Sequence, residues 1–61
     1  MASNSNYYLQ QASYMLLKAI YAENEELKEA LDAGKVDLSQ YTAKIGTLSS
    51  FRTQIEFMIK P

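Results

Sequence analysis

The sequence predicts an all-α fold, an antiparallel two-helix hairpin that dimerises into a four-helix bundle. Three observations support this prediction. Two long stretches are rich in good helix formers and contain no proline. A glycine and a helix-start pattern lie together between them. Within both stretches, apolar residues recur at alternating steps of three and four, the spacing of packed helices. The chain of 61 residues is expected to form a single domain, residues 1–61.

The first helix is expected over about residues 6–33. Residues 1–5 are short and polar, so this stretch is expected to fray. Ser5 or Asn6 can cap the first turn, because their side-chain oxygens accept bonds from its free N–H groups. Gly34 directly follows "EALDA", where a glycine in the left-handed conformation can end the helix.

The second helix is expected over about residues 38–60, after a turn at about 34–37. Asp37 and Gln40 have the spacing of a capping box, in which two side chains bond to the free backbone groups of the first turn. Val36 and Tyr41 have the spacing of a hydrophobic staple. A connection this short predicts that the two helices run antiparallel.

Each helix carries an apolar seam with one charged position, Glu23 in the first and Arg52 in the second. We hypothesise that these two residues form an ion pair, within one hairpin or across a dimer, that sets the register. The alternative is that both side chains reach the solvent at the edge of the seam. The expected seam comprises Leu9, Ala12, Leu16, Ile20, Glu23, Leu27 and Leu31, facing Leu38, Tyr41, Ile45, Leu48, Arg52, Ile55 and Ile59.

A second apolar stripe lies on the first helix away from this seam. Three tyrosines recur at intervals of seven, which returns to nearly the same side of a helix. The second helix carries a strip of mostly small residues at spacings of three and four. A tyrosine ring can lie over such a strip while its hydroxyl reaches a serine or threonine. The predicted interaction face comprises Tyr7, Tyr14, Leu17 and Tyr21 with Thr42, Gly46, Ser50 or Ser49, Thr53 and Phe57.

Self-association is the expected use of this face. A chain this short buries only about 60% of its unfolded surface. Small domains commonly compensate with disulfides, metals or oligomerisation, and the absence of Cys and His removes disulfides and zinc sites. A homo-oligomer, with a dimer favoured, is therefore expected. Two alternatives stay open: the tyrosines dock a different protein, or they are simply exposed to solvent.

The composition argues against several other functions. Without His, Cys or a catalytic motif, no enzyme activity, cofactor site or metal site is expected. The net charge of −1 disfavours nucleic-acid binding, although Lys18, Lys44, Arg52 and Lys60 could cluster in an oligomer. No apolar run of about 18 residues is present, so no membrane span is expected. With no secretory signal pattern, an intracellular location is the default expectation.

The expected function is that of a non-catalytic interaction or assembly protein acting through an aromatic helix face. An adaptor, a small chaperone and a structural or virion accessory subunit all fit this description. The alternative is a small nucleic-acid-binding regulator of the helical-bundle type. The architecture is similar to hairpins that dimerise into plasmid-copy-control-type bundles, to hairpin chaperones and to virion accessory proteins. Function does not follow from architecture alone. The acidic stretch 23–32 is expected to be a solvated face or, alternatively, a tip for a basic partner.

Overall fold

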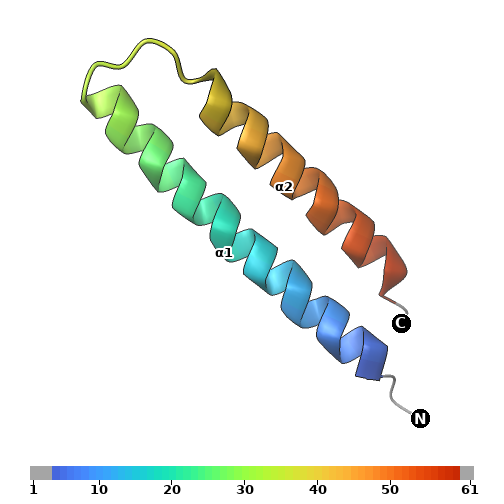
Figure 1. Ribbon diagram of the computed structural model, residues 1–61. Coiled ribbons are helices and arrows are strands. Elements are labelled where there is room, and N and C mark those ends of the chain that lie inside the picture. The colour runs from blue at the N-terminus through green and yellow to red at the C-terminus, as the bar shows by residue number, and fades with distance from the viewer. Residues whose placement is uncertain (1–3, 60–61) are drawn as a thin grey trace.

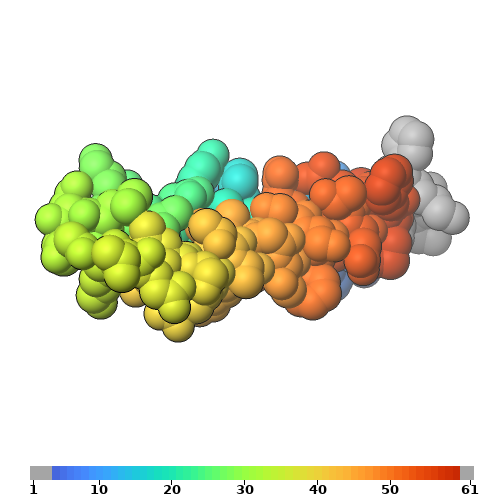
Figure 2. Space-filling model, turned by 90° about the horizontal axis from the view of Figure 1, so that it is seen from above, coloured from blue at the N-terminus to red at the C-terminus, as the bar shows by residue number. Residues whose placement is uncertain are grey.

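The computed structural model describes residues 4–59, which form two α-helices, α1 (Asn4–Asp32) and α2 (Ser39–Met58). The helices pack side by side in opposite directions, joined by a short connection (Figure 1). The hairpin is a rod with extents of 53 × 14 × 12 Å. Figure 2 shows the rod from above, with the turn at one end and the C-terminal part of α2 toward the other. The predicted all-α hairpin is confirmed.

The beginning of α1 differs from the prediction. Asn4 and Ser5 are already helical, so residues 4 and 5 of the stretch expected to fray belong to the helix. Residues 1–3 lie outside the described part of the chain. Ser5 and Asn6 are helical, so neither occupies the N-cap position predicted for it. Polar side chains suit a first turn because they can accept bonds from N–H groups that have no intrahelical partner.

Gly34 ends α1 as predicted. Its φ angle is +80°, in the left-handed region that glycine enters without steric cost. The N–H of Lys35 donates to the carbonyl of Ala30, and the N–H of Gly34 donates to the carbonyl of Leu31, both at 3.0 Å. This pair of bonds is the Schellman motif, which satisfies carbonyls left free at the end of a helix.

Asp37 stabilises the start of α2, but not through the predicted capping box. Its carboxylate accepts from the backbone N–H and the hydroxyl of Ser39, at 3.2 and 2.8 Å. Gln40 is not the donor, because the helix begins one residue later than expected and Leu38 occupies the N-cap position. The staple is also wrong: Val36 is 98% exposed, since the turn carries it away from Tyr41 and the helices.

We expect Asp37→Ala to lower the unfolding temperature at pH 7. Both bonds from Ser39 lower the pKa of the Asp37 carboxyl, the side-chain bond more than the backbone bond. Asp37 therefore contributes stability above its unfolded pKa of about 3.9, and this contribution is lost as pH falls through the lower folded pKa. Thermal unfolding of both proteins across this range should show the difference at pH 7 and a much smaller one near pH 2.

Asp32→Ala is the matched control for this cap. It removes an exposed carboxylate from the C-terminal end of α1, where the helix dipole disfavours negative charge. It should not lower the unfolding temperature at pH 7. An equal loss in both variants would show that Asp37 acts through net charge rather than through its bonds to Ser39.

The last helical residue of α2 is Met58, and Ile59 is extended, with φ −74° and ψ 123°. The predicted end near residue 60 is therefore too late within the described residues, and Lys60 lies outside them. Helices usually end at or before the residue that precedes a proline, because the proline ring crowds a helical neighbour. Here Pro61 follows two residues after Ile59.

The two helices meet along the predicted seam, with two differences among the buried residues of α1. Every half-buried residue from Leu38 to Ile59 belongs to the predicted seam of the second helix. In α1, Leu31 is 55% exposed and Ala30 is buried in its place. Ser13, beside the predicted Ala12, is buried as well. When steps of three and four residues alternate strictly, the seam residue after Leu27 is Ala30. The larger Leu31 therefore lies on the flank of the seam.

This seam buries very little apolar volume. Among residues 4–59, Ala30 is the one buried apolar side chain, and no large side chain is fully buried. The other two buried residues, Ser13 and Glu23, are polar. Ten large apolar side chains within the described part of the chain are half exposed or more. The hairpin therefore presents outward much of the apolar surface that would form a core.

Candidate interaction site

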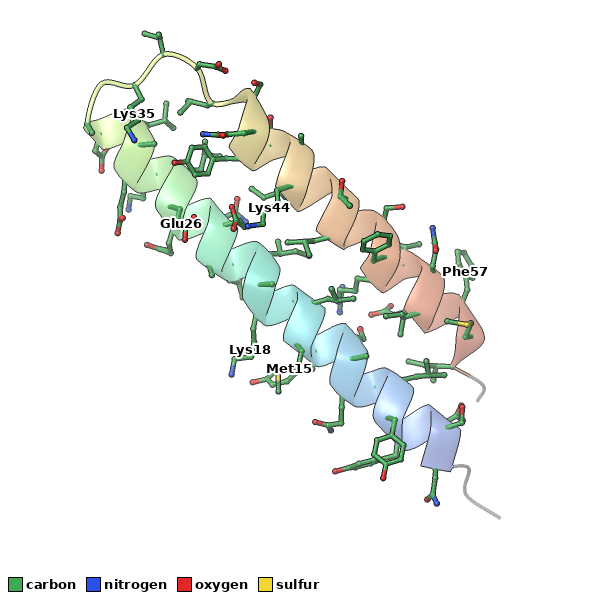
Figure 3. All side chains as sticks on the ribbon, in the orientation of Figure 1. Met15, Lys18, Glu26, Lys35, Lys44 and Phe57 are labelled. Carbon is green, nitrogen blue, oxygen red and sulfur yellow. The ribbon has the colours of Figure 1, made fainter. Side chains whose placement is uncertain are left out.

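Glu23 and Lys44 link the helices in the half nearer the turn. The Lys44 ammonium lies 2.8 Å from Oε1 of the buried Glu23 carboxylate. The hydrogen bond and charge of Glu23 raise the pKa of Lys44, with a further contribution from Glu26. Figure 3 shows Lys44 extending from α2 toward α1, beside Glu26. Most of the Lys44 side chain stays exposed to solvent, while its ammonium group neutralises the Glu23 carboxylate inside the seam.

A second polar cluster links the helices in the half nearer the chain ends. Oε1 of Glu56 accepts a hydrogen bond from the Ser13 hydroxyl at 2.9 Å. The same oxygen lies 2.9 Å from a terminal nitrogen of Arg52, one turn earlier in α2. Nε of Arg52 is buried and finds no hydrogen-bond partner within residues 4–59. Arg52 is therefore only partly satisfied at its seam position.

The hypothesised Glu23–Arg52 pair does not form within the hairpin. Glu23 binds Lys44 and Arg52 binds Glu56. Lys44 and Arg52 are eight residues apart, about 12 Å along a helix. The antiparallel register places Lys44 opposite Glu23, so Arg52 is carried out of reach. The form of this pair that crosses a dimer stays a prediction.

These contacts also define the two broad faces of the rod. Lys44 crosses to Glu23 on the flank of α1 that carries Glu26. Glu56 crosses to Ser13 on the opposite flank. At 100° per residue, Leu17 falls on this second flank, on the same side as Thr42 and Thr53 of α2, and the tyrosine stripe lies beyond Leu17, toward the outer side of α1. We call this surface the tyrosine face; it comprises Tyr7, Tyr14, Leu17, Tyr21, Thr42, Gly46, Ser49 and Thr53.

The three tyrosines of this face are between 54% and 61% exposed, and Leu17 is half-buried. The Lys18 ammonium lies 5.5 Å from the centre of the Tyr14 ring. The hydroxyls of Thr42 and Thr53 donate to carbonyls in their own helix, at 3.0 Å each. Each threonine oxygen can still accept, so a tyrosine hydroxyl from outside has acceptors here.

Two residues of the predicted interaction face lie elsewhere. Phe57 is two residues from both Ile55 and Ile59, which turns it about 200° from the seam. It is 85% exposed and points away from α1 (Figure 3). Ser50 has the same relation to Leu48 and Arg52 and is exposed. Both therefore lie on the outer side of α2, and Ser49 is the serine on the tyrosine face.

The α2 half of the opposite broad face was missed by the sequence reasoning. Phe51 and Met58 follow Lys44 at intervals of seven, so they lie on the flank from which Lys44 crosses. Both are about half exposed. The seven-residue spacing is visible in the sequence, but only the contact of Lys44 with Glu23 shows on which side of the hairpin Phe51 and Met58 lie. We call this surface the Phe51 face; it comprises Tyr8, Ala12, Met15, Ala19, Phe51 and Met58.

The described residues offer little for other chemistry. No group of three or more acidic side chains within residues 4–59 is arranged to hold a metal ion. Neither α1 nor α2, as described, combines the length and apolar content needed to cross a bilayer. Comparison with protein-family models, curated proteins and solved structures finds no match to this chain. Seven of the ten large exposed apolar side chains among residues 4–59 belong to the tyrosine face or the Phe51 face.

Proposed function

We propose that this chain is a non-catalytic assembly protein, one half of a homodimeric four-helix bundle that closes through the tyrosine face. The observation that carries the proposal is the near absence of a core in one hairpin. Among residues 4–59, only Ala30 is a buried apolar side chain, whereas ten large apolar side chains are at least half exposed. Apolar burial is the main favourable term in folding, so such a chain gains most by sharing a core.

The exposed area has the size that one partner would cover. A compact monomer of 6.9 kDa exposes about 4,000 Å². This hairpin exposes 4840 Å², roughly 800 Å² more. Each partner in a standard protein interface buries about 800 Å². Burial of about 800 Å² on each copy would bring the exposed area per chain close to that of a compact monomer.

The tyrosine face is suited to bind a second copy of itself because it carries both projecting rings and a recess that can receive them. The rings of Tyr14 and Tyr21 project from α1, and Gly46 leaves space on α2. Under a two-fold axis, the rings of one copy can lie over the small strip of the other. Tyrosine hydroxyls would then donate to Thr42 or Thr53 of that copy. A nucleic-acid function gains no comparable support, since the cations of Lys44 and Arg52 each bind a carboxylate.

We expect Gly46→Leu to weaken self-association at least about tenfold, because a leucine fills the space that a ring would occupy. No described side chain lies within 4 Å of a Cβ at Gly46, so the hairpin itself accommodates the change. Sedimentation over a wide range of micromolar concentrations measures the effect. Circular dichroism should show that helix content is kept.

Ala43→Leu is the matched control for this test. Ala43 is exposed and two residues from both Tyr41 and Ile45, so it lies on the outer side of α2. Its association should equal that of the wild type. A monomeric wild type, or equal masses for the wild type and Gly46→Leu, would rule out the proposed dimer.

A further inference from the structure

The Phe51 face would stay uncovered in that dimer, because it lies on the other broad side of the rod. Phe51 is 50% exposed, Met58 54%, Met15 57% and Tyr8 67%. Monomeric proteins rarely expose a contiguous apolar patch of more than a few hundred Å². Such a face calls for an occupant of its own.

The shape of this face matches a second copy of the same face. Its α1 flank carries the small side chains Ala12 and Ala19, whereas its α2 flank carries the large side chains Phe51 and Met58. An interface around a two-fold axis joins a patch to itself, so the patch must contain both projections and recesses. Here the large side chains of one copy would pack over the alanines of the other.

The charges agree with this arrangement and indicate its orientation. Near the turn the same face becomes polar and carries Lys44 beside Glu26 (Figure 3). When two copies lie with their turns at the same end, apolar halves meet apolar halves, and Lys44 of each copy lies near Glu26 of the other. In the reversed orientation, Phe51 would cover Glu26 and the Lys44–Glu23 pair, which then lose water without gaining further partners.

We propose that the Phe51 face binds a second copy of this chain around a two-fold axis, with the two turns at the same end. This inference rests on the proposed tyrosine-face dimer only for the number of copies that assemble. The Phe51 interface itself does not require that dimer. Two self-complementary faces on opposite sides of a flat hairpin do not close into a ring. They join hairpins layer upon layer, so the assembly stays open and grows with concentration. The chain is then a two-sided building unit.

Charged substitutions on each face separate the two interfaces. We compare wild type, Phe51→Glu, Tyr14→Glu and the combined variant by sedimentation over a wide concentration range. Wild type should exceed a dimer, and its mean mass should rise with concentration. Each single variant should stop at a dimer, and the combined variant should be a monomer. Ala43→Glu, with the same charge on the outer side of α2, should behave as wild type.

The outcomes distinguish the two proposals. If Phe51→Glu leaves the mass unchanged in both the wild-type and Tyr14→Glu backgrounds, the Phe51 face binds no second copy and this inference is overturned. If Tyr14→Glu leaves the mass unchanged, the tyrosine-face dimer fails while the Phe51 interface stands. Circular dichroism of each variant should show the wild-type helix content, which excludes unfolding as the cause of a lower mass.

The orientation has its own measurement. A spin label on Lys35→Cys, in the turn, is placed in the Tyr14→Glu background, where only Phe51-face dimers form. The chain has no other cysteine. Turns at the same end predict a label separation well below the 53 Å length of the rod. A separation close to that length would overturn the orientation.

Discussion

We expect Arg52→Leu to stabilise the hairpin by about 1–2 kcal/mol. Arg52 occupies a seam position where its buried Nε has no partner within residues 4–59. An unsatisfied buried donor costs about 1–3 kcal/mol. The ion pair with Glu56 offsets little of this cost, because both side chains are more than a third exposed and exposed pairs contribute about 0–1 kcal/mol. A leucine removes the unsatisfied donor and adds apolar contact along the seam.

Glu56 is not left stranded in this variant, since its exposed carboxylate keeps water and the Ser13 hydroxyl. Thermal and denaturant unfolding at one protein concentration measure the change, expected as a rise of roughly 5–15 °C. Gln54→Leu is the control, since it adds the same side chain at an exposed position of α2. A less stable Arg52→Leu would show that the Ser13–Glu56–Arg52 cluster contributes more than its exposure indicates.

We expect alanine substitutions at the two glycines to change stability in opposite directions. Gly34→Ala should destabilise by about 1–2 kcal/mol, because its φ of +80° brings a Cβ too close to the backbone. Gly46→Ala should stabilise by about 1 kcal/mol, because alanine has the higher helix propensity. No described side chain lies within 4 Å of either Cβ position, so contacts with neighbouring side chains do not complicate the comparison.

Each glycine variant serves as the control for the other, since both add one methyl group to the same chain. In a domain of this size, 1 kcal/mol shifts the unfolding temperature by about 4–8 °C. The two variants should therefore lie on either side of wild type. A loss of stability in both would mean that Gly46 is needed for close approach of a second helix, which would favour a tighter dimer than a tyrosine stripe allows.

Local signals predicted much of the hairpin because they act within a few residues. Helix propensity explains two helices, and the conformational freedom of Gly34 explains where α1 ends. The seam of α2 was also readable from the spacing of its apolar residues. The errors at Ser5, Val36 and Leu31 are shifts of one or two residues in where a helix starts or which neighbour faces the seam.

The partners of the charged residues could not be predicted, because they depend on the register between the helices. A shift of one turn in an antiparallel pair changes which residues lie opposite by several positions. Glu23 meets Lys44 rather than Arg52 for this reason. Ser13 was overlooked because a small polar residue gives no periodicity signal, yet it reaches Glu56 across the interface.

By itself the sequence determined the helices, their turn and the presence of more apolar surface than one hairpin can bury. Those properties depend on backbone preferences and on the spacing of residues within one helix. The tertiary structure decided how that surface is divided. The contacts of Lys44 with Glu23 and of Ser13 with Glu56 show which flank of each helix lies on which side of the rod. They thereby separate the tyrosine face from the Phe51 face. Spacing alone says which residues share a side of one helix, whereas only packing says which sides of two helices coincide.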